Sequence, residues 1–79
     1  MSDPFAWDAA KAARNLTRHG VSFDEAATAF VDPLALTVPD REHSTTEARF
    51  VLLGRSATGR LLVVVHTDRA DVIRIISAR

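Results

Sequence analysis

Cysteine is absent from the 79 residues, and this absence excludes a disulfide framework and a zinc site built from thiolates. Long apolar runs are lacking as well, because none approaches the roughly 20 residues that a membrane-spanning helix needs. The first residues, MSDPFAWD, do not have the basic-then-apolar order of a signal peptide. We therefore expect a cytoplasmic protein that does not associate with a membrane.

Charge of one sign is also lacking, since ten basic and ten acidic residues give a formal net charge of zero. This balance argues against indiscriminate coating of nucleic acid, but it is compatible with a local basic patch. Every cation except Lys11 is an arginine, whose planar guanidinium binds phosphate or carboxylate through two hydrogen bonds. The length predicts one domain, residues 1–79, near the lower limit for a self-sufficient core.

Residues 9–19 carry the signals of a first helix, with Asp8 as its N-cap and Gly20 directly after its last turn. Its apolar side is expected to face the core and consists of Ala9, Ala12, Ala13 and Leu16. Its other side consists of Lys11, Arg14, Asn15 and Arg18. This second side is either a solvated face or a basic ridge for an RNA backbone or an acidic partner.

A second helix is predicted to begin at Ser22. Ser22 and Glu25 have the spacing of a capping box, in which each side chain binds the backbone N–H of the other residue. The helix is expected to run to about Phe30 and to end before Pro33, because a residue that precedes proline disfavours helical conformation. Both helices are too short to be stable alone, so they must pack on the rest of the chain.

Four later stretches have the branched, apolar composition of strands. They are residues 34–38, 47–54, 61–66 and 72–76, and the short polar connection between the last two suits an antiparallel hairpin. Residues 5–7 are either a small edge strand or a plug for the core. The predicted class is α+β, with two N-terminal helices packed on a mostly antiparallel sheet of four to five strands.

Arg74 is the anomaly of the last predicted strand, because burying an unpaired charge is expensive. A pairing with Asp68, Asp71 or Glu47 would explain it without a function. Arg79 lies five residues further on, so an unbroken strand would place the two guanidinium groups on opposite faces of the sheet. A bulge, or a strand that ends near Ser77, would bring them together, and the sequence leaves these arrangements open.

His43, Glu47 and Arg49 gather an imidazole, a carboxylate and a guanidinium within seven residues. Cleavage of RNA without a metal needs a base for the ribose 2′-hydroxyl, an acid for the leaving oxygen and cations for the phosphate. The alternative is a solvated loop histidine beside a Glu–Arg ion pair. No two histidines have the spacing of a metal site, so neither a metal nor a cofactor is expected.

Five groups of residues follow one another along the chain. They are Phe5-Ala6-Trp7-Asp8 with Lys11 and Asn15; Arg18-His19-Gly20-Val21-Ser22-Phe23-Asp24-Glu25-Ala26; Phe30-Val31-Asp32-Pro33; His43-Ser44 with Glu47 and Arg49; and Ile73-Arg74-Ile75-Ile76-Ser77-Ala78-Arg79. Each group alone is a weak signal. Together, over nearly the whole chain, they resemble the BrnT family of bacterial type II toxins.

The resemblance implies a RelE-like fold and a ribonuclease that arrests growth by cutting RNA. It also implies a hetero-oligomer with a BrnA-like antitoxin, whose ribbon-helix-helix domain binds DNA, dimerises and represses the shared operon. The residues expected in catalysis are His43, Glu47, Arg49, Arg74 and Arg79, with His43 or Glu47 transferring protons and the arginines binding phosphate. The residues expected to bind RNA are Lys11, Arg14, Arg18, His19 and Arg69. The alternatives are a favourable charge at a helix C-terminus for His19 and a solvated turn position for Arg69.

Members of this family usually continue into a basic C-terminal helix, whereas this chain stops at Arg79. We therefore expect an exposed apolar area on the sheet near residues 72–76, filled by a second copy of the chain or by the antitoxin. The alternative function is a non-catalytic module that only binds its antitoxin or another protein.

Overall fold

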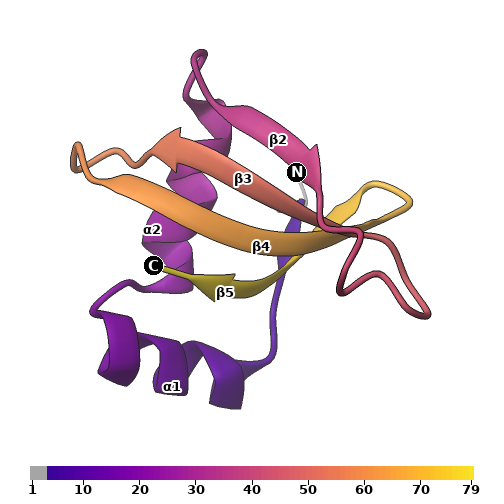
Figure 1. Ribbon diagram of the computed structural model, residues 1–79. Coiled ribbons are helices and arrows are strands. Elements are labelled where there is room, and N and C mark those ends of the chain that lie inside the picture. Colours follow the sequence, from indigo (N-terminus) through magenta and orange to yellow (C-terminus); the bar gives the residue numbers. More distant parts are fainter. Residues whose placement is uncertain (1–3) are drawn as a thin grey trace.

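Five strands and two helices make up the part of the chain that the computed structural model describes, residues 4–79 (Figure 1). The strands are β1 (Phe5–Ala6), β2 (Leu36–Pro39), β3 (Arg49–Arg55), β4 (Leu61–Arg69) and β5 (Val72–Ala78). The helices are α1 (Ala9–His19) and α2 (Phe23–Thr28), and α2 continues as a 3-10 turn, Ala29–Val31. One sheet holds the strands in the order β1-β5-β4-β3-β2, in which only β1 runs parallel to its neighbour. The predicted α+β class with a mostly antiparallel sheet is confirmed.

The hydrophobic core lies between α2 and one face of the sheet. Alternation along the strands sends Leu52, Val64 and Ala78 to this face, where they are register partners on β3, β4 and β5. Phe23 of α2 is buried among them and packs edge to face against Trp7, with ring centroids 5.9 Å apart. One face of the sheet is therefore covered by α2, and the opposite face is not part of this core.

Ser22 begins α2 as predicted, and its hydroxyl accepts a hydrogen bond from the Glu25 N–H at 3.0 Å. The Glu25 carboxylate, expected to turn back to Ser22, instead accepts hydrogen bonds from the β3–β4 connection. Its donors there are Arg60, Ser56 and Thr58. The hydrogen bonds from Arg60 are the main cause that lowers the pKa of Glu25 to about 2. The carboxylate thus stays ionised and ties the start of α2 to the hairpin.

The predicted caps at the two ends of α1 are confirmed. The Asp8 carboxylate accepts a hydrogen bond from the Lys11 N–H at 3.0 Å. Gly20 follows the helix at φ 69°, a left-handed conformation that a residue without Cβ adopts without strain. Together these caps fix the length of α1.

Within residues 4–79, no helix has the length and the apolar composition to cross a membrane.

α1 lies along the edge of the sheet, below β5 in Figure 1, rather than over its face. Asn15, expected on the outward polar side, is only 7% exposed. Its side chain donates to the carbonyls of Val21 and Ala78 at 2.9 and 2.7 Å and accepts from the Ala78 N–H at 3.1 Å. Leu16, expected in the core, is 52% exposed, and of the four apolar positions only Ala12 packs on the core. The prediction was wrong because the polar side of α1 meets the unpaired edge of β5.

The connection between β4 and β5 is shorter than predicted. β4 continues through Arg69 and β5 begins at Val72, so the turn is formed by Ala70, at φ 50°, and Asp71. Thr67, expected in the polar connection, is therefore a strand residue and is only 3% exposed. The hydroxyl of Thr67 suggests a loop, whereas its branched side chain suits a strand, and the structure follows the second signal.

A β-bulge decides the placement of Arg74 and Arg79. Arg74 is the register partner of Thr67 in β4, and the register between the two strands then shifts by one residue. Arg79 exchanges both backbone hydrogen bonds with Val63 as a result. Because Thr67 and Val63 are four residues apart in one strand, they face the same side of the sheet. Arg74 and Arg79 therefore share the face opposite α2.

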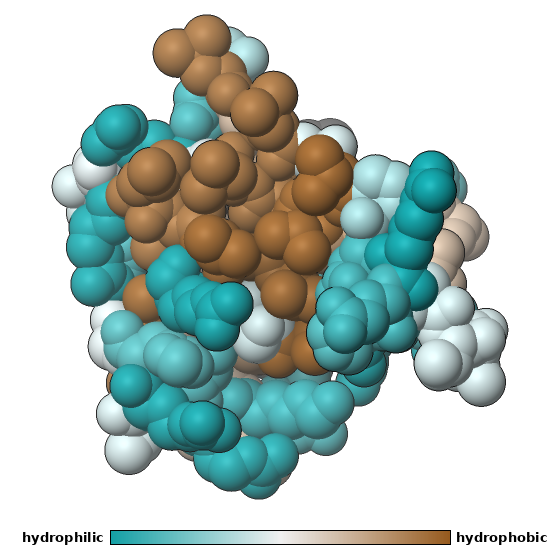
Figure 2. Space-filling model, viewed as in Figure 1, coloured by the Kyte–Doolittle hydropathy of each residue, from teal (hydrophilic) through white to brown (hydrophobic). Residues whose placement is uncertain are grey.

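That face carries a broad apolar surface, seen as the brown area in Figure 2. We refer to it as the open apolar face, whose exposed members are Leu34, Leu36, Val38, Leu53 and Leu61. Such a surface was predicted near residues 72–76, where Val72 is the exposed large hydrophobic residue. Ile75 faces the core and is buried, and the apolar surface instead follows β2, β3 and β4, over which no helix of residues 4–79 packs.

Candidate functional site

Arg49, Thr67 and Arg74 form a row across three neighbouring strands on the face opposite α2. Arg49 of β3 is the register partner of Thr67 in β4, and Thr67 is the partner of Arg74 in β5. Partners across strands point to the same face, and adjacent strands lie about 4.8 Å apart. The two arginine backbones are therefore about 10 Å apart, with the threonine midway between them. We refer to this arrangement as the arginine row.

The arginine row lines a cavity of about 170 Å³. Five residues that were singled out from the sequence line it together: Lys11, His43, Glu47, Arg49 and Arg74. They come from α1, from the loop between β2 and β3, and from β3 and β5, which are distant in the sequence. The fold thus brings three cations, an imidazole and a carboxylate to one place.

The guanidinium groups of Arg49 and Arg74 have no carboxylate partner among residues 4–79. The ion pairs in this part of the chain join Asp40 to His43, Glu25 to Arg60, Asp68 to His66 and Glu47 to Arg69. Both cavity arginines are partly buried. Glu47 lines the same cavity and its charge acts on both arginines, but its two oxygens are bound by Arg69. Two partly buried cations without an ion pair of their own are suited to binding an anion from outside the chain.

Glu47 is held as a carboxylate by the cations around it. Arg69 donates to both of its oxygens, through Nε and, at 3.0 Å, through Nη2. This contact is the main cause that lowers the pKa of Glu47, and the charges of Arg74 and Arg49 lower it further. Arg69, expected at a solvated turn or on RNA, is thus engaged within the chain. Of the two groups considered for proton transfer, Glu47 is thus committed to an ion pair, which leaves His43 as the candidate.

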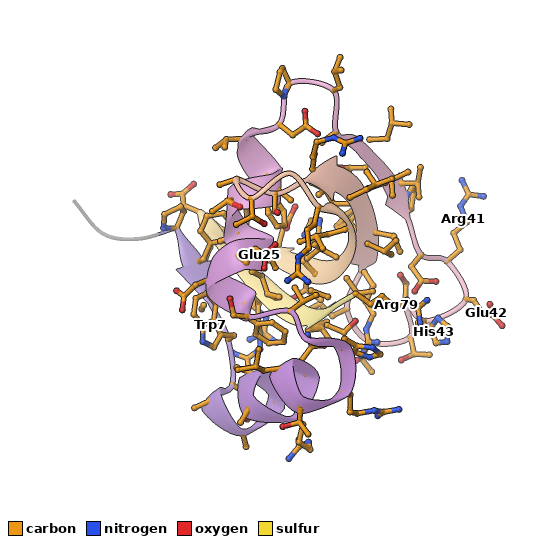
Figure 3. The ribbon with its side chains drawn as sticks, turned by 90° about the vertical axis from the view of Figure 1, so that its left-hand side faces the viewer. Trp7, Glu25, Arg41, Glu42, His43 and Arg79 are labelled. Carbon is orange, nitrogen blue, oxygen red and sulfur yellow. The ribbon has the colours of Figure 1, made fainter. Side chains whose placement is uncertain are left out.

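His43 stands on a loop that is closed at its base by hydrogen bonds. The Asp40 N–H donates to the Arg49 carbonyl at 2.8 Å, and the Ser44 hydroxyl bridges the Asp40 carbonyl and the Arg49 N–H. Nδ1 of His43 lies 3.0 Å from a carboxylate oxygen of Asp40. If Nδ1 donates there, Nε2 is the unprotonated nitrogen of the neutral ring. Figure 3 shows His43 standing out from the sheet on the side away from α2.

A second hollow, of about 160 Å³, adjoins the cavity along α1, since Lys11 and Ile76 line both. Its wall carries Arg14, Arg18 and His19, three of the residues predicted to bind RNA. No ion pair within residues 4–79 involves these three side chains. The cavity and this hollow therefore make one basic groove, which runs from the arginine row along α1.

Arg79 lies on the same side of the sheet but outside the cavity lining. Its partner Val63 is four residues from Thr67 along β4, which corresponds to about 13 Å. Figure 3 places Arg79 on the side of the sheet from which His43 projects. Arg79 thus borders the open apolar face and is not a direct neighbour of the arginine row.

Sequence reasoning missed two residues of the site, Thr67 and Asp40. Assigning the turn to Ala70 and Asp71 would have paired Thr67 with Arg74 directly, since partners in a hairpin are equidistant from its turn. Asp40 precedes His43 by three residues, a spacing at which a loop aspartate reaches a histidine.

Within residues 4–79, no three His, Asp or Glu side chains are grouped so as to hold a metal ion.

Comparison with protein families finds a match over most of the chain. The family described as ribonuclease toxin, BrnT, of type II toxin-antitoxin system matches residues 7–79. A search of curated proteins gives no match. The family match includes every residue of the cavity and of the basic groove, and a type II system implies an antitoxin partner. The chain therefore belongs to the BrnT family of ribonuclease toxins.

Proposed function

We propose that this chain is an endoribonuclease that cuts RNA without a metal ion in the cavity around the arginine row. The observation that carries the proposal is the pair of partly buried guanidinium groups, Arg49 and Arg74, without a carboxylate partner among residues 4–79. A scissile phosphate between them would give both guanidinium groups an ion-pair partner. The basic groove along α1 would hold neighbouring phosphates of the same strand.

The proposed reaction uses the 2′-hydroxyl of the RNA as the nucleophile. Its oxygen attacks the adjacent phosphorus, the bond to the 5′-oxygen of the next nucleotide breaks, and the products are a 2′,3′-cyclic phosphate and a 5′-hydroxyl. Nε2 of His43 accepts the proton of the attacking hydroxyl, and the leaving 5′-oxygen takes its proton from a water molecule. Arg49 and Arg74 stabilise the charge that develops on the phosphate oxygens in the transition state.

Two residues predicted to be catalytic receive other roles in this proposal. Glu47, whose pKa is lowered by Arg69, stays ionised and holds the end of the β4–β5 hairpin against the loop before β3. Arg79 binds RNA at a distance from the cleaved bond, because its place in the register is about 13 Å from the arginine row.

Incubation of the purified chain with single-stranded RNA in excess EDTA tests this function. We expect the RNA to be cut as fast as in magnesium, with 2′,3′-cyclic phosphate ends. An oligonucleotide with 2′-hydrogen at the cut position should stay intact, because it lacks the nucleophile. Cleavage that disappears in EDTA would disprove metal independence. RNA that stays whole under both conditions would leave the non-catalytic binding module as the better account.

We also infer where a BrnA-like antitoxin with a ribbon-helix-helix domain would bind, namely across the open apolar face and the arginine row. Four leucines of that face surround a hollow of about 270 Å³ that can receive an apolar side chain: Leu34, Leu36, Leu53 and Leu61. Along β3 and β4 the open apolar face adjoins the arginine row, whose Arg49 and Arg74 form no ion pair among residues 4–79. A segment with an apolar stripe and acidic residues at one end would match both parts and block the cavity.

The variant Leu53→Asp tests this interface, because it places a charge in the middle of the open apolar face. We expect it to weaken binding of the cognate antitoxin by tenfold or more, about 1.4 kcal/mol, while RNA cleavage is retained. Leu16→Asp is the matched control, since Leu16 is an exposed leucine of α1 outside that face. Equal antitoxin affinity for both variants and the unchanged chain would place the interface elsewhere. Growth arrest on expression of the chain alone, and normal growth on co-expression with the antitoxin, would agree with neutralisation by that antitoxin.

A further inference from the structure

Thr67 lies in the middle of the arginine row, and its hydroxyl has no hydrogen-bond partner among residues 4–79. Its side chain is 3% exposed and lines the cavity. Burying a hydroxyl without a hydrogen bond is unfavourable. A valine at this position would have the same shape and the same preference for a strand without that penalty. Packing therefore does not account for the hydroxyl.

The surroundings of Thr67 indicate which ligand would satisfy it. Arg49 and Arg74 flank it on the adjacent strands, and neither guanidinium has a carboxylate partner among residues 4–79. A hydroxyl group between two such cations matches a tetrahedral anion, which offers several acceptor oxygens at once. A carboxylate ligand would have two oxygens, which the two guanidinium groups alone would occupy.

We propose that Thr67 is a phosphate-binding residue, whose hydroxyl donates a hydrogen bond to a non-bridging oxygen of the phosphate held by Arg49 and Arg74. The inference rests on the proposed ribonuclease function and adds a specific donor to it. The hydroxyl is buried in the chain without a ligand, so phosphate binding requires neighbouring side chains of the cavity to move aside. Thr67 then fixes the orientation of the phosphate relative to His43, which the two flexible arginine side chains alone do not.

The variants Thr67→Val and Thr67→Ser test the inference. Thr67→Val keeps the shape of the side chain and removes the hydroxyl, so we expect a melting temperature equal to or above that of the unchanged chain. We expect its cleavage rate, and its affinity for a 2′-O-methyl RNA oligonucleotide, to fall about tenfold, the effect of one hydrogen bond to a charged group. Thr67→Ser keeps the donor and should stay within about threefold of the unchanged chain in both measurements.

The oligonucleotide binding separates this inference from the proposed function, because a 2′-O-methyl RNA cannot be cut. If the unchanged chain cuts no RNA, the function fails, and a tenfold weaker binding by Thr67→Val still supports the inference. Thr67→Val that binds as tightly as the unchanged chain overturns the inference and leaves the function intact. A melting temperature several degrees lower for Thr67→Val also overturns it, because the hydroxyl would then be a structural group. If the unchanged chain does not bind the oligonucleotide, both proposals are wrong.

Discussion

Arg74→Ala is expected to slow RNA cleavage by about 10²–10³-fold, the loss that follows removal of one group that stabilises charge in a transition state. Arg49→Ala should have a similar effect, because Arg49 and Arg74 occupy equivalent places on either side of Thr67. Neither change should lower the melting temperature, since neither guanidinium has a carboxylate partner among residues 4–79. Initial rates on one defined oligonucleotide, together with thermal unfolding of each variant, measure both effects.

Arg55→Ala is the matched control for these two changes. Arg55 ends the same strand that Arg49 begins and faces the same side of the sheet, but it lies beside Leu61 at the other end. Removing it should change the cleavage rate by less than about threefold, an effect expected of a group outside the site. Losses below about threefold for both Arg49→Ala and Arg74→Ala would contradict the site. Arg74→Lys should recover part of the activity, because lysine keeps the charge but not the planar fork.

Asn15→Ala is expected to lower the free energy of unfolding by about 2–4 kcal/mol, because it leaves three buried backbone groups without partners. The groups are the N–H and C=O of Ala78 and the C=O of Val21. A domain of this length has about 4–12 kcal/mol of stability in total, so the loss is a large share of it. The melting temperature should fall by about 10–20 °C, which thermal or urea unfolding would measure.

Thr17→Ala is the control for this second change. Thr17 lies on the same helix, is exposed, and its hydroxyl binds only the Ala13 carbonyl of its own helix. A change to alanine there should leave the free energy of unfolding within about 0.5 kcal/mol of that of the unchanged chain. If Asn15→Ala is no less stable than Thr17→Ala, the side chain of Asn15 is not what joins α1 to the edge of β5.

Local signals predicted the elements well, because each depends on neighbouring residues in the sequence. The caps at Asp8 and Gly20 and the start of α2 at Ser22 were all confirmed. The branched runs gave the strands of the sheet, with ends shifted by a few residues. Errors arose where a side chain is satisfied by a distant element. Glu25 has the spacing of a capping box, but its carboxylate is bound by Arg60, 35 residues away.

The sequence by itself determined the α+β class, the two helices, the strands and the residue types that can bind and cleave a phosphodiester. Only the tertiary structure decided which cations meet. Arg74 lies next to Thr67 and Arg49 because the turn at Ala70 and Asp71 sets the register of two hairpin strands. The bulge in β5 then turned Arg79 to the same face, about 13 Å away. Periodicity tells which side of a strand a residue faces, but the pairing of distant strands is set by turns and bulges, which composition does not encode.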